Sequence, residues 1–499
     1  MMDAPVVHDC CGSPAAPSRI PERKDDCCAG SAASGRTPDL VVIGAGSAGF
    51  SASIRAGELG AKVALIGHGT IGGTCVNIGC VPSKTLIRAA EALHHARSAS
   101  RFAGLTGTAT LTDWQALVAQ KDDLVSGLRT AKYENLLPRY DHIRYIEGAA
   151  RLTNGGVQAA GEIFPAGRVV IATGAAPAVP AIPGLATVPW LTSTTALSLA
   201  KLPRSLLVIG GGVIGCELGQ MFARFGVQVT IVCRSRLLPG FEVEIGEALT
   251  GYLRAEGIEV RCGLAYDSIR RTEQGIALRI EADGQMQELA AEQVLVATGR
   301  TPNTGGLGLE TADVATDGRG AIVVDEHLQT TRGGVYAAGD VTGRDEYVYM
   351  AAYGAKLAAE NALEGNTRRY DARAMPEVVF TDPQVASVGL TETGARRDGY
   401  HVEAMTLALD QVPRALAARD TRGLIKLVAE ARTGLLLGAH ILAPEGSDSI
   451  QAAVLAIKHR LTIKDLTETL FPYLTTAEGL KLAALSFGKD VALLSCCAG

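Results

Sequence analysis

The chain has 499 residues, enough for about three domains, and 47 basic against 52 acidic residues give a net charge of −5. The lack of a basic excess argues against a nucleic-acid-binding protein, and a hydrophobic content of 47% argues against a disordered chain. No run reaches the ~18 apolar residues of a membrane span, and the acidic N-terminus is unlike a secretory signal, so we expect a cytoplasmic protein without a membrane span.

Residues 1–37 are rich in Pro, Ser, Ala and charge without a hydrophobic period, which predicts a flexible tail. From Asp39 onward a strand, a Gly-rich turn, a helix and a second strand follow one another, and Leu206–Cys233 repeats this plan. Two such openings predict two Rossmann-like dinucleotide-binding domains in an α/β chain. After Asp371, strand-like and helical runs alternate, which is typical of an α+β domain.

The first glycine motif is Gly44-x-Gly46-x-x-Gly49, which follows a clean apolar strand and opens a helix. These glycines allow a tight turn, the approach of a pyrophosphate, and close packing of helix on strand. A mere tight turn is the alternative interpretation, and the flanking strand and helix argue against it. The acid that commonly binds the ribose is missing, because the second strand ends at Gly67-His68.

The second glycine motif is Gly210-x-Gly212-x-x-Gly215, and its second strand also lacks a terminal acid. Arg234 and Arg236 follow that strand, where guanidiniums suit a ribose 2′-phosphate. This pattern favours NADP over NAD. A solvated basic turn is the alternative.

The eleven cysteines are distributed unevenly. Six form three adjacent pairs at 10–11, 27–28 and 496–497, whereas Cys216, Cys233 and Cys262 are scattered and are most simply small packing residues.

Cys75 and Cys80 flank four residues, so one helical turn at a helix start could bring the two sulfurs together. The helix dipole would then lower the pKa of a thiolate. Two core cysteines are the alternative, which Gly72-Gly73 before the pair and Pro82 after it disfavour. We therefore expect a redox pair.

The segment GGTCVNIGCVPSK resembles the signature of the flavin-dependent pyridine nucleotide–disulfide oxidoreductases. The segments ATGAAP (172–177), ATGRTPN (297–303) and TTRGGVYAAGDV (330–341) agree with it, so the resemblance covers residues 39 to about 490. It implies FAD and NAD(P)H as cofactors, and the two arginines after the second motif favour NADPH. It also implies an FAD domain at 38–180 and 311–371, an inserted NADPH domain at 181–310 and a dimerisation domain at 372–499.

The resemblance also implies roles for single residues. Cys80 would be the thiolate that faces the flavin and Cys75 the outer thiol, while Lys84 would lie against the flavin and pair with Glu217. Asp340 would bind the ribityl chain of FAD. The remaining candidate cofactor-binding residues are Thr74, Thr173, Gly174 and Gly339.

The C-terminal region distinguishes branches of the family. Members that reduce disulfides carry His-Pro-Thr, with a Glu five residues after the His, but this chain has Phe471-Pro472-Tyr473 and Thr476. Phe cannot transfer a proton to a leaving thiol. FPYLTTAEGLKLAA and a terminal Cys-Cys instead resemble the branch that reduces Hg(II) to elemental mercury, in which a pair such as Cys496-Cys497 hands the metal to the inner pair.

A soft metal such as Hg(II) suits this interpretation, because it prefers thiolates and its reduction needs no proton for a leaving group. Hg(II) would arrive as a thiol complex, and Cys75, Cys80, Cys496 and Cys497 would bind it. The Tyr473 phenol contacts the bound metal in one interpretation and is an interface aromatic in the other. Likewise, the N-terminal cysteine pairs either scavenge metal or are incidental in a spacer.

We expect a homodimer with shared active sites, in which the C-terminal tail of one chain reaches the flavin of the other. Two rival functions remain. One is a reductase for a disulfide or another soft oxidant, and the other is a thiol-rich metal-sequestering protein with a vestigial flavin fold. The intact glycine motifs and the redox pair argue against the second rival.

Overall fold

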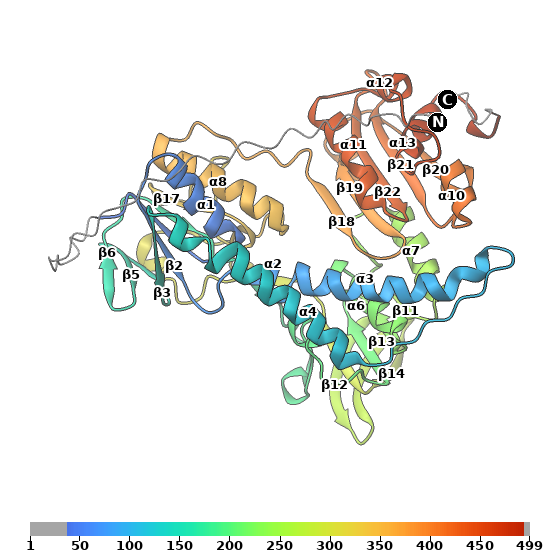
Figure 1. Cartoon of the computed structure of the whole chain (residues 1–499), viewed down its shortest axis with the longest axis horizontal. Helices are drawn as coiled ribbons and strands as arrows, with labels where there is room; N and C mark the ends of the chain where they lie inside the picture. The colour runs from blue at the N-terminus through green and yellow to red at the C-terminus, as the bar shows by residue number, and fades with distance from the viewer. Residues whose placement is uncertain (1–36, 494–499) are drawn as a thin grey trace, which may run out of the picture. The chain divides into compact units, whose positions relative to one another are not determined.

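The computed structural model describes residues 37–493, and its first sheet is entirely parallel (Figure 1). The strand order in that sheet is β17-β7-β1-β2-β3. The strands are β1 (Leu40–Ile43), β2 (Val63–Gly67), β3 (Ile143–Glu147), β7 (Val169–Ile171) and β17 (Val335–Ala337). Helices α1 (Ser47–Glu58) and α8 (Val348–Glu364) pack against each other and against this sheet. Because β17 lies beside β7, the chain returns to the first sheet after a long inserted segment.

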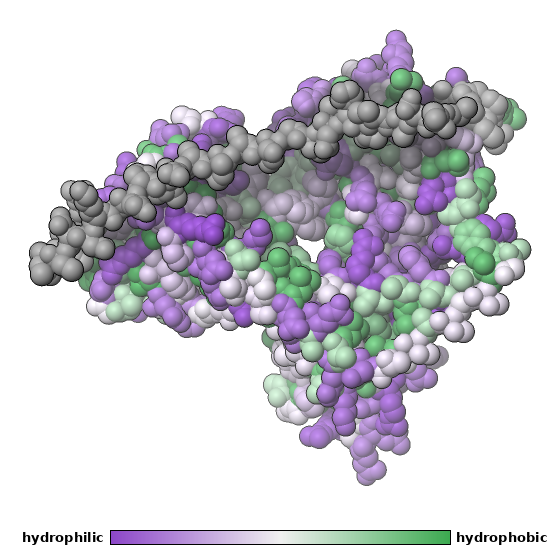
Figure 2. Space-filling model, in the orientation of Figure 1, coloured by the Kyte–Doolittle hydropathy of each residue, from purple (hydrophilic) through white to green (hydrophobic). Residues whose placement is uncertain are grey.

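The inserted segment contains a second parallel sheet, in the order β11-β10-β9-β15. Its strands and helices are β9 (Ser205–Ile209), α6 (Val213–Arg224), β10 (Gln228–Val232), α7 (Val243–Ala255), β11 (Glu259–Arg261) and β15 (Gln293–Val296). The two Rossmann-like units that the sequence predicts are therefore confirmed. An antiparallel sheet of β12 (Ala265–Thr272), β13 (Gly275–Ala282) and β14 (Gln285–Ala291) lies beside this unit, and Figure 2 shows a largely hydrophilic surface there.

The third region is an antiparallel sheet, in the order β18-β19-β22-β21-β20. Its strands are β18 (Pro376–Val379), β19 (Gln384–Gly389), β20 (Val402–Ala408), β21 (Leu424–Glu430) and β22 (Leu436–Ala443). Its helices are α9 (Glu392–Arg397), α10 (Pro413–Ala418), α11 (Gly446–Lys458), α12 (Ile463–Glu468) and α13 (Glu478–Leu485). The expected α+β region is thus present.

The remaining elements connect these parts. They are α2 (Gly73–Ile78), α3 (Cys80–Arg97), α4 (Trp114–Arg129), β4 (Arg151–Thr153), β5 (Gly156–Ala159), β6 (Glu162–Phe164), β8 (Ala175–Pro177), α5 (Ser193–Ala196) and β16 (Arg300–Pro302). Helix α3 packs against α6, so the first region contacts the second through these two helices (Figure 1). The strands β8 and β16 pair antiparallel where the chain leaves and re-enters the first region.

A buried ionic cluster joins all three regions. Arg224 of α6 lies 2.8 Å from Glu256 and 2.9 Å from Asp382, and Arg422 lies 3.1 Å from Asp382. His95 of α3 adds a third contact to the Asp382 carboxylate, at 3.5 Å. Burial alone would raise the pKa of Asp382, but the His95 hydrogen bond and the two guanidiniums hold it well below its usual range.

Replacing Asp382 with Asn is expected to destabilise the folded protein by about 3–5 kcal/mol, because Arg224 is left buried without one of its carboxylates. A carboxyl whose pKa is lower in the folded state than in the unfolded state stabilises the folded protein fully at pH values above its unfolded-state pKa. That stabilisation is lost as the pH falls towards the folded-state pKa. The difference in the free energy of unfolding between the unaltered protein and Asp382→Asn should therefore be largest at about pH 7 and shrink below pH ~4. Urea-unfolding midpoints measured across this range test it.

The matched control is Asp398→Asn, since Asp398 is exposed and its carboxylate pairs with the neighbouring Arg397 at 3.2 Å. It should change stability by less than about 1 kcal/mol. Equal midpoints for Asp382→Asn and Asp398→Asn would show that the cluster does not stabilise the contact between the regions.

Candidate active site

The first glycine turn leaves no room for side chains. Gly44 has a φ of +117°, and a Cβ there would lie 2.2 Å from the Ala172 carbonyl oxygen; a Cβ on Gly49 would lie 1.7 Å from the Gly44 oxygen. Gly46 caps α1 without a side-chain hydrogen bond, so the first N–H groups of the helix are available to an anion. The turn fits the pyrophosphate of a dinucleotide.

The second turn repeats this geometry. A Cβ on Gly210 would lie 2.2 Å from the Ala297 oxygen, and one on Gly215 would lie 2.1 Å from the Gly210 oxygen. Gly212 caps α6, again without a side-chain hydrogen bond, and a Cβ there would meet nothing within 4 Å. Open space above an uncapped helix N-terminus fits a second dinucleotide phosphate.

The missing ribose acid has a steric explanation. A Cβ on Gly67 would lie 2.6 Å from the Ala45 Cβ and 2.7 Å from the Tyr145 hydroxyl, so no larger residue fits. His68, which follows, is exposed. The register partner of Gly67 on β3 is Glu147, an exposed carboxylate at the same edge of the sheet.

The spacing predicted that one helical turn holds both cysteines, but in the structure the pair is divided between two helices. Cys75 lies in α2, whereas Cys80 is the first residue of α3. Gly79 separates the helices with φ −121° and ψ −109°, values outside the helical range. Pro82 is accommodated because it stands in the first turn of α3, where no backbone N–H is needed.

The two sulfurs nevertheless meet. Both side chains are half-buried, and the Cys75 thiol donates a hydrogen bond to Cys80. That hydrogen bond lowers the pKa of Cys80 to about 7; burial opposes the shift and the Lys84 charge supports it. The same hydrogen bond, together with burial, raises the pKa of Cys75. One sulfur is therefore ready to ionise near neutrality while the other holds its proton.

An ion pair lies beside the cysteines, as the resemblance predicted. Lys84 Nζ lies 2.7 Å from Glu217 Oε2 and 4.9 Å from the centre of the Phe380 ring. The other Glu217 oxygen accepts the Phe380 backbone N–H at 2.9 Å, and the Glu217 side chain is almost completely buried. Three segments that are far apart in the sequence thus hold one charge pair next to Cys80.

Two tyrosines near the pair were missed by the sequence analysis. The rings of Tyr347 and Tyr349 stack at 5.5 Å, and the Tyr349 hydroxyl donates to the Pro376 carbonyl. Burial and the Glu377 charge raise both phenol pKa values, and the Cys80 charge contributes to that of Tyr349. Two tyrosines spaced two apart, shortly after the Asp340 turn, are the signal that could have found them.

Asp340 starts a short 3₁₀ turn after Gly339, whose φ is +77°. Its carboxylate lies 3.4 Å from the Arg300 guanidinium, which also donates to the Ala175 carbonyl. Asp340 thus stands at the crossing where β8 and β16 connect the first two regions.

The other predicted cofactor residues lie at turns. Thr173 donates to the Asn303 carbonyl at 2.8 Å, and Asn303 donates back at 3.0 Å, so the two connecting segments are tied together. Gly174 follows with φ +71°, which favours glycine. Thr74 is exposed at the start of α2.

The two predicted phosphate-binding arginines differ in the structure. Arg234 is exposed after β10. Arg236 instead donates from Nη1 and Nη2, at 2.6–3.2 Å, to the carbonyls of Leu237, Leu238, Pro239 and Phe241. Because these donors are occupied by its own loop, Arg236 organises that loop, and the phosphate prediction rests on Arg234.

Tyr473 lies between α12 and α13, where 47% of its surface is exposed. Phe471, which replaces the proton-transferring His, packs on the hydrophobic core of the third region. The adjacent cysteine pairs at 10–11, 27–28 and 496–497 lie outside the described residues.

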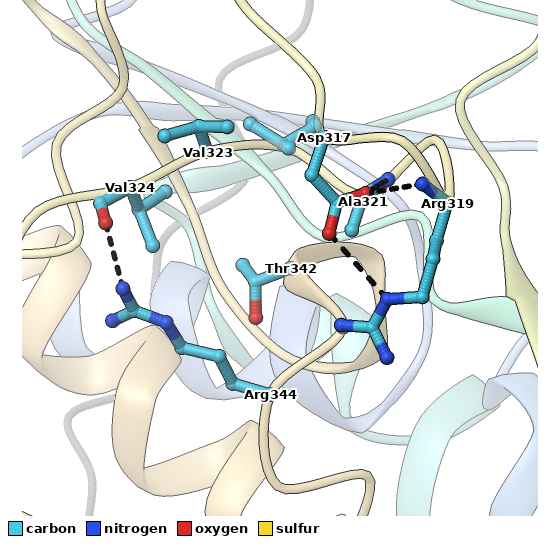
Figure 3. A pocket seen from close by; sticks show the side chains of 9 residues that line it. Asp317, Arg319, Ala321, Val323, Val324, Thr342 and Arg344 are labelled. Carbon is cyan, nitrogen blue, oxygen red and sulfur yellow. Dashed lines mark hydrogen bonds and ion pairs between the residues drawn. The ribbon is translucent and has the colours of Figure 1, made fainter.

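A pocket in the second segment of the first region is formed by nine residues (Figure 3). Within it, Arg319 lies 3.5 Å from Asp317, and Arg344 donates to the Val324 carbonyl at 2.8 Å. Its charged groups are therefore already engaged, and no cysteine lines it, so the redox chemistry belongs elsewhere. Residues 37–493 contain no cluster of three or more His, Cys, Asp or Glu side chains suited to a metal ion.

Two family models match the chain. The pyridine nucleotide-disulphide oxidoreductase model matches residues 38–359, and the dimerisation domain of the same family matches residues 375–484. Among the helices of the described part, none has the length and apolar character needed to cross a membrane.

Similar proteins agree with the family match. The mercuric reductase of Staphylococcus aureus is 48% identical over 92% of this chain and 84% of its own length. That of Streptomyces lividans is 46% identical over 92% of this chain and 98% of its own length. A solved structure, the Cu(II) complex of the HOCl-induced flavoprotein disulfide reductase RclA from Escherichia coli, is 32% identical with a TM-score of 0.79, covering 90% of this chain and all of that one.

Proposed function

Because the chain belongs to the pyridine nucleotide-disulphide oxidoreductase family, we propose that it reduces Hg(II) to elemental mercury with electrons from NADPH. The observation that carries the proposal is the hydrogen-bonded pair of Cys75 and Cys80, two thiols of different acidity beside the Lys84–Glu217 ion pair. Two sulfurs held together are the ligands that a soft cation prefers.

The two glycine turns divide the cofactors between them. The turn at Gly44–Gly49 and the N-terminus of α1 bind the FAD pyrophosphate, and the turn at Gly210–Gly215 and α6 bind that of NADPH. When bound, FAD carries two electrons from NADPH to the substrate at the dithiol. Glu147 takes the place of the acid that is missing at Gly67 and binds the FAD ribose.

The cysteines bind the metal in sequence. Cys80, whose pKa is lowered to about 7, attacks as the thiolate and displaces one thiol from an Hg(II)–thiol complex. Cys75 then gives up its proton to the second departing thiol, and both sulfurs bind the metal. Lys84 supplies positive charge beside the thiolate, and Glu217 fixes its ammonium. Hg(II) accepts two electrons and leaves as the neutral atom, so no proton donor is needed where Phe471 stands.

The proposal includes a dimer with shared sites in the cytoplasm, where NADPH is available and thiols stay reduced. The family's dimerisation-domain model matches the third region of this chain. In the loop after α12 of that region, the exposed fractions of the side chains are 92% for Leu470, 47% for Tyr473 and 43% for Leu474. Apolar side chains in such a loop suit a partner surface. Tyr473 then contacts the metal bound to the other chain, and Cys496 and Cys497 deliver it.

The deciding experiment measures NADPH oxidation by the FAD-loaded enzyme with Hg(II) and excess thiol, together with mercury vapour in the headspace. One mercury atom should be released per NADPH oxidised. Parallel assays with a small-molecule disulfide and with Cu(II) test the rival reductase. Turnover with either of these, without Hg(II)-dependent vapour, would overturn the proposal.

Arg234→Gln is expected to raise the Michaelis constant for NADPH about 10- to 100-fold and to leave that for NADH nearly unchanged, because a charge-assisted hydrogen bond to the 2′-phosphate is lost. Arg270→Gln, an exposed arginine in the same region, is the control and should change neither. Arg236→Gln should instead lower the thermal stability, since it removes the donors of a loop. Equal use of NADH and NADPH by the unaltered enzyme would contradict the assignment.

A further inference from the structure

A second pair of thiols lies at the edge of the nucleotide-binding sheet. Cys233 follows β10 and Cys262 follows β11, and the last register pair of these parallel strands is Val232 with Arg261. The Cys233 N–H donates to the Arg261 carbonyl at 2.9 Å, so the pairing extends to the cysteines. Adjacent strands lie about 4.8 Å apart, a spacing within the Cα separation of ~4.4–6.8 Å that a disulfide spans.

The sulfurs already face each other, with Sγ to Sγ at 3.2 Å. Cys262 is half-buried, whereas Cys233 is buried with 4% of its surface accessible. The hydrogen bond from the Cys233 thiol lowers the pKa of Cys262 to about 7, and a backbone hydrogen bond and the Arg254 charge support that shift against burial. Cys262, the less buried of the two, is therefore the nucleophile, and the Cys233 thiol can attack the mixed disulfide that Cys262 forms.

The pair also adjoins the second glycine turn. A Cβ on Gly211 would lie 3.0 Å from the Cys233 sulfur, so that sulfur packs directly beneath the turn. Cys233 directly follows the second strand of the βαβ unit, near the place where a Rossmann-like fold binds the adenosine ribose. A bound nucleotide would therefore cover the edge that an attacking reagent must reach.

We propose that Cys233 and Cys262 are a second redox-active dithiol, which small-molecule disulfides oxidise and which bound NADPH or NADP⁺ shields. This inference does not depend on mercury as the substrate. It replaces the packing role that the sequence had suggested for these two cysteines.

The chemistry is thiol–disulfide exchange. The Cys262 thiolate attacks one sulfur of a disulfide RSSR, forms a Cys262–SR bond and releases RS⁻. Cys233 then transfers its proton to the medium and attacks the Cys262 sulfur, so the Cys233–Cys262 bond forms and the second RS⁻ leaves. Two electrons pass from the protein to RSSR, which becomes two thiols after both leaving groups take up protons.

The test treats the reduced, FAD-loaded enzyme with oxidised glutathione, quenches samples by alkylation and analyses tryptic peptides by mass spectrometry. Cys233 and Cys262 fall on separate peptides, 225–234 and 262–270, each with a single cysteine. A disulfide-linked pair of these peptides should accumulate. Saturating NADP⁺ should slow its formation at least tenfold.

Single variants separate the steps. Cys233→Ala should trap glutathione on Cys262 as a stable mixed disulfide, and Cys262→Ala should leave Cys233 unmodified. The matched control is Cys216→Ala: Cys216 is buried in the same region and donates weakly to the Gly211 carbonyl at 3.7 Å, and its removal should leave the cross-link unchanged. Absence of the linked peptides in the unaltered enzyme would overturn the dithiol. A cross-linking rate unaffected by NADP⁺ would overturn its coupling to the nucleotide.

Discussion

Cys80→Ala is expected to lose Hg(II)-dependent NADPH oxidation by at least about a thousandfold, because it removes the sulfur that both ionises and binds the metal. Cys75→Ala should lose as much, since one thiolate cannot hold the metal in place for reduction. Both variants should still bind FAD, because the glycine turn that holds it is untouched. Steady-state rates and the flavin absorbance measure the two properties.

The control for these two variants is Cys216→Ala, which removes a buried thiol of α6 outside the pair and should retain full activity. Retained turnover in either site variant would exclude the dithiol as the metal site.

The ionisation of Cys80 gives the same site a pH signature. In the unaltered enzyme, alkylation of Cys80 should fall about tenfold per pH unit below about 7, because only the thiolate reacts. The hydrogen bond from Cys75 is the largest cause of the lowered pKa, so Cys75→Ala should move that midpoint upward, towards the ordinary cysteine value. Peptide-resolved alkylation rates measure both midpoints. An unchanged midpoint in Cys75→Ala would show that the hydrogen bond does not activate Cys80.

Two inactive variants are expected to restore activity when they share one dimer. The first carries Cys75→Ala with Cys80→Ala, and the second carries Cys496→Ala with Cys497→Ala. Each homodimer should fail with thiol-bound mercury. In the heterodimer, one site combines an intact inner pair with the terminal pair of the other chain, so about half of the normal activity should return.

Heterodimers purified with two different affinity tags provide the material for this assay. Mercury release per dimer is the measurement, and the unaltered enzyme carrying both tags is the control. Heterodimers without recovered turnover would show that each site uses the terminal pair of its own chain.

The sequence predicted the features that depend on short-range patterns. The glycine turns could be predicted because their backbone conformation and close packing demand glycine at fixed spacings, and the family resemblance implied the pairing of Lys84 with Glu217. It failed where the backbone conformation of single residues and side-chain to backbone hydrogen bonds decide. Gly79 breaks the helix between the two cysteines, and Arg236 is held by its own loop.

Other features depend on neighbours that no spacing reveals. Gly67 is glycine because Tyr145, from another strand, occupies the space of a side chain. Cys233 and Cys262 are 29 residues apart in the sequence, and only the register of β10 with β11 brings their sulfurs together. Short motifs therefore pointed to the redox pair at Cys75 and Cys80, whereas the proximity of Cys233 and Cys262 could be found only from the pairing of the strands.

The charge pair at the redox site is completed late in synthesis. Lys84 belongs to the first region and Glu217 to the second, and the backbone donor to Glu217 comes from Phe380 in the third. A nascent chain that ends before the third region has both cysteines but lacks that donor. A ribosome-bound fragment should thus carry both thiols without the Phe380 hydrogen bond that fixes Glu217. Soft metals would encounter the complete binding site only after the whole chain has emerged and folded.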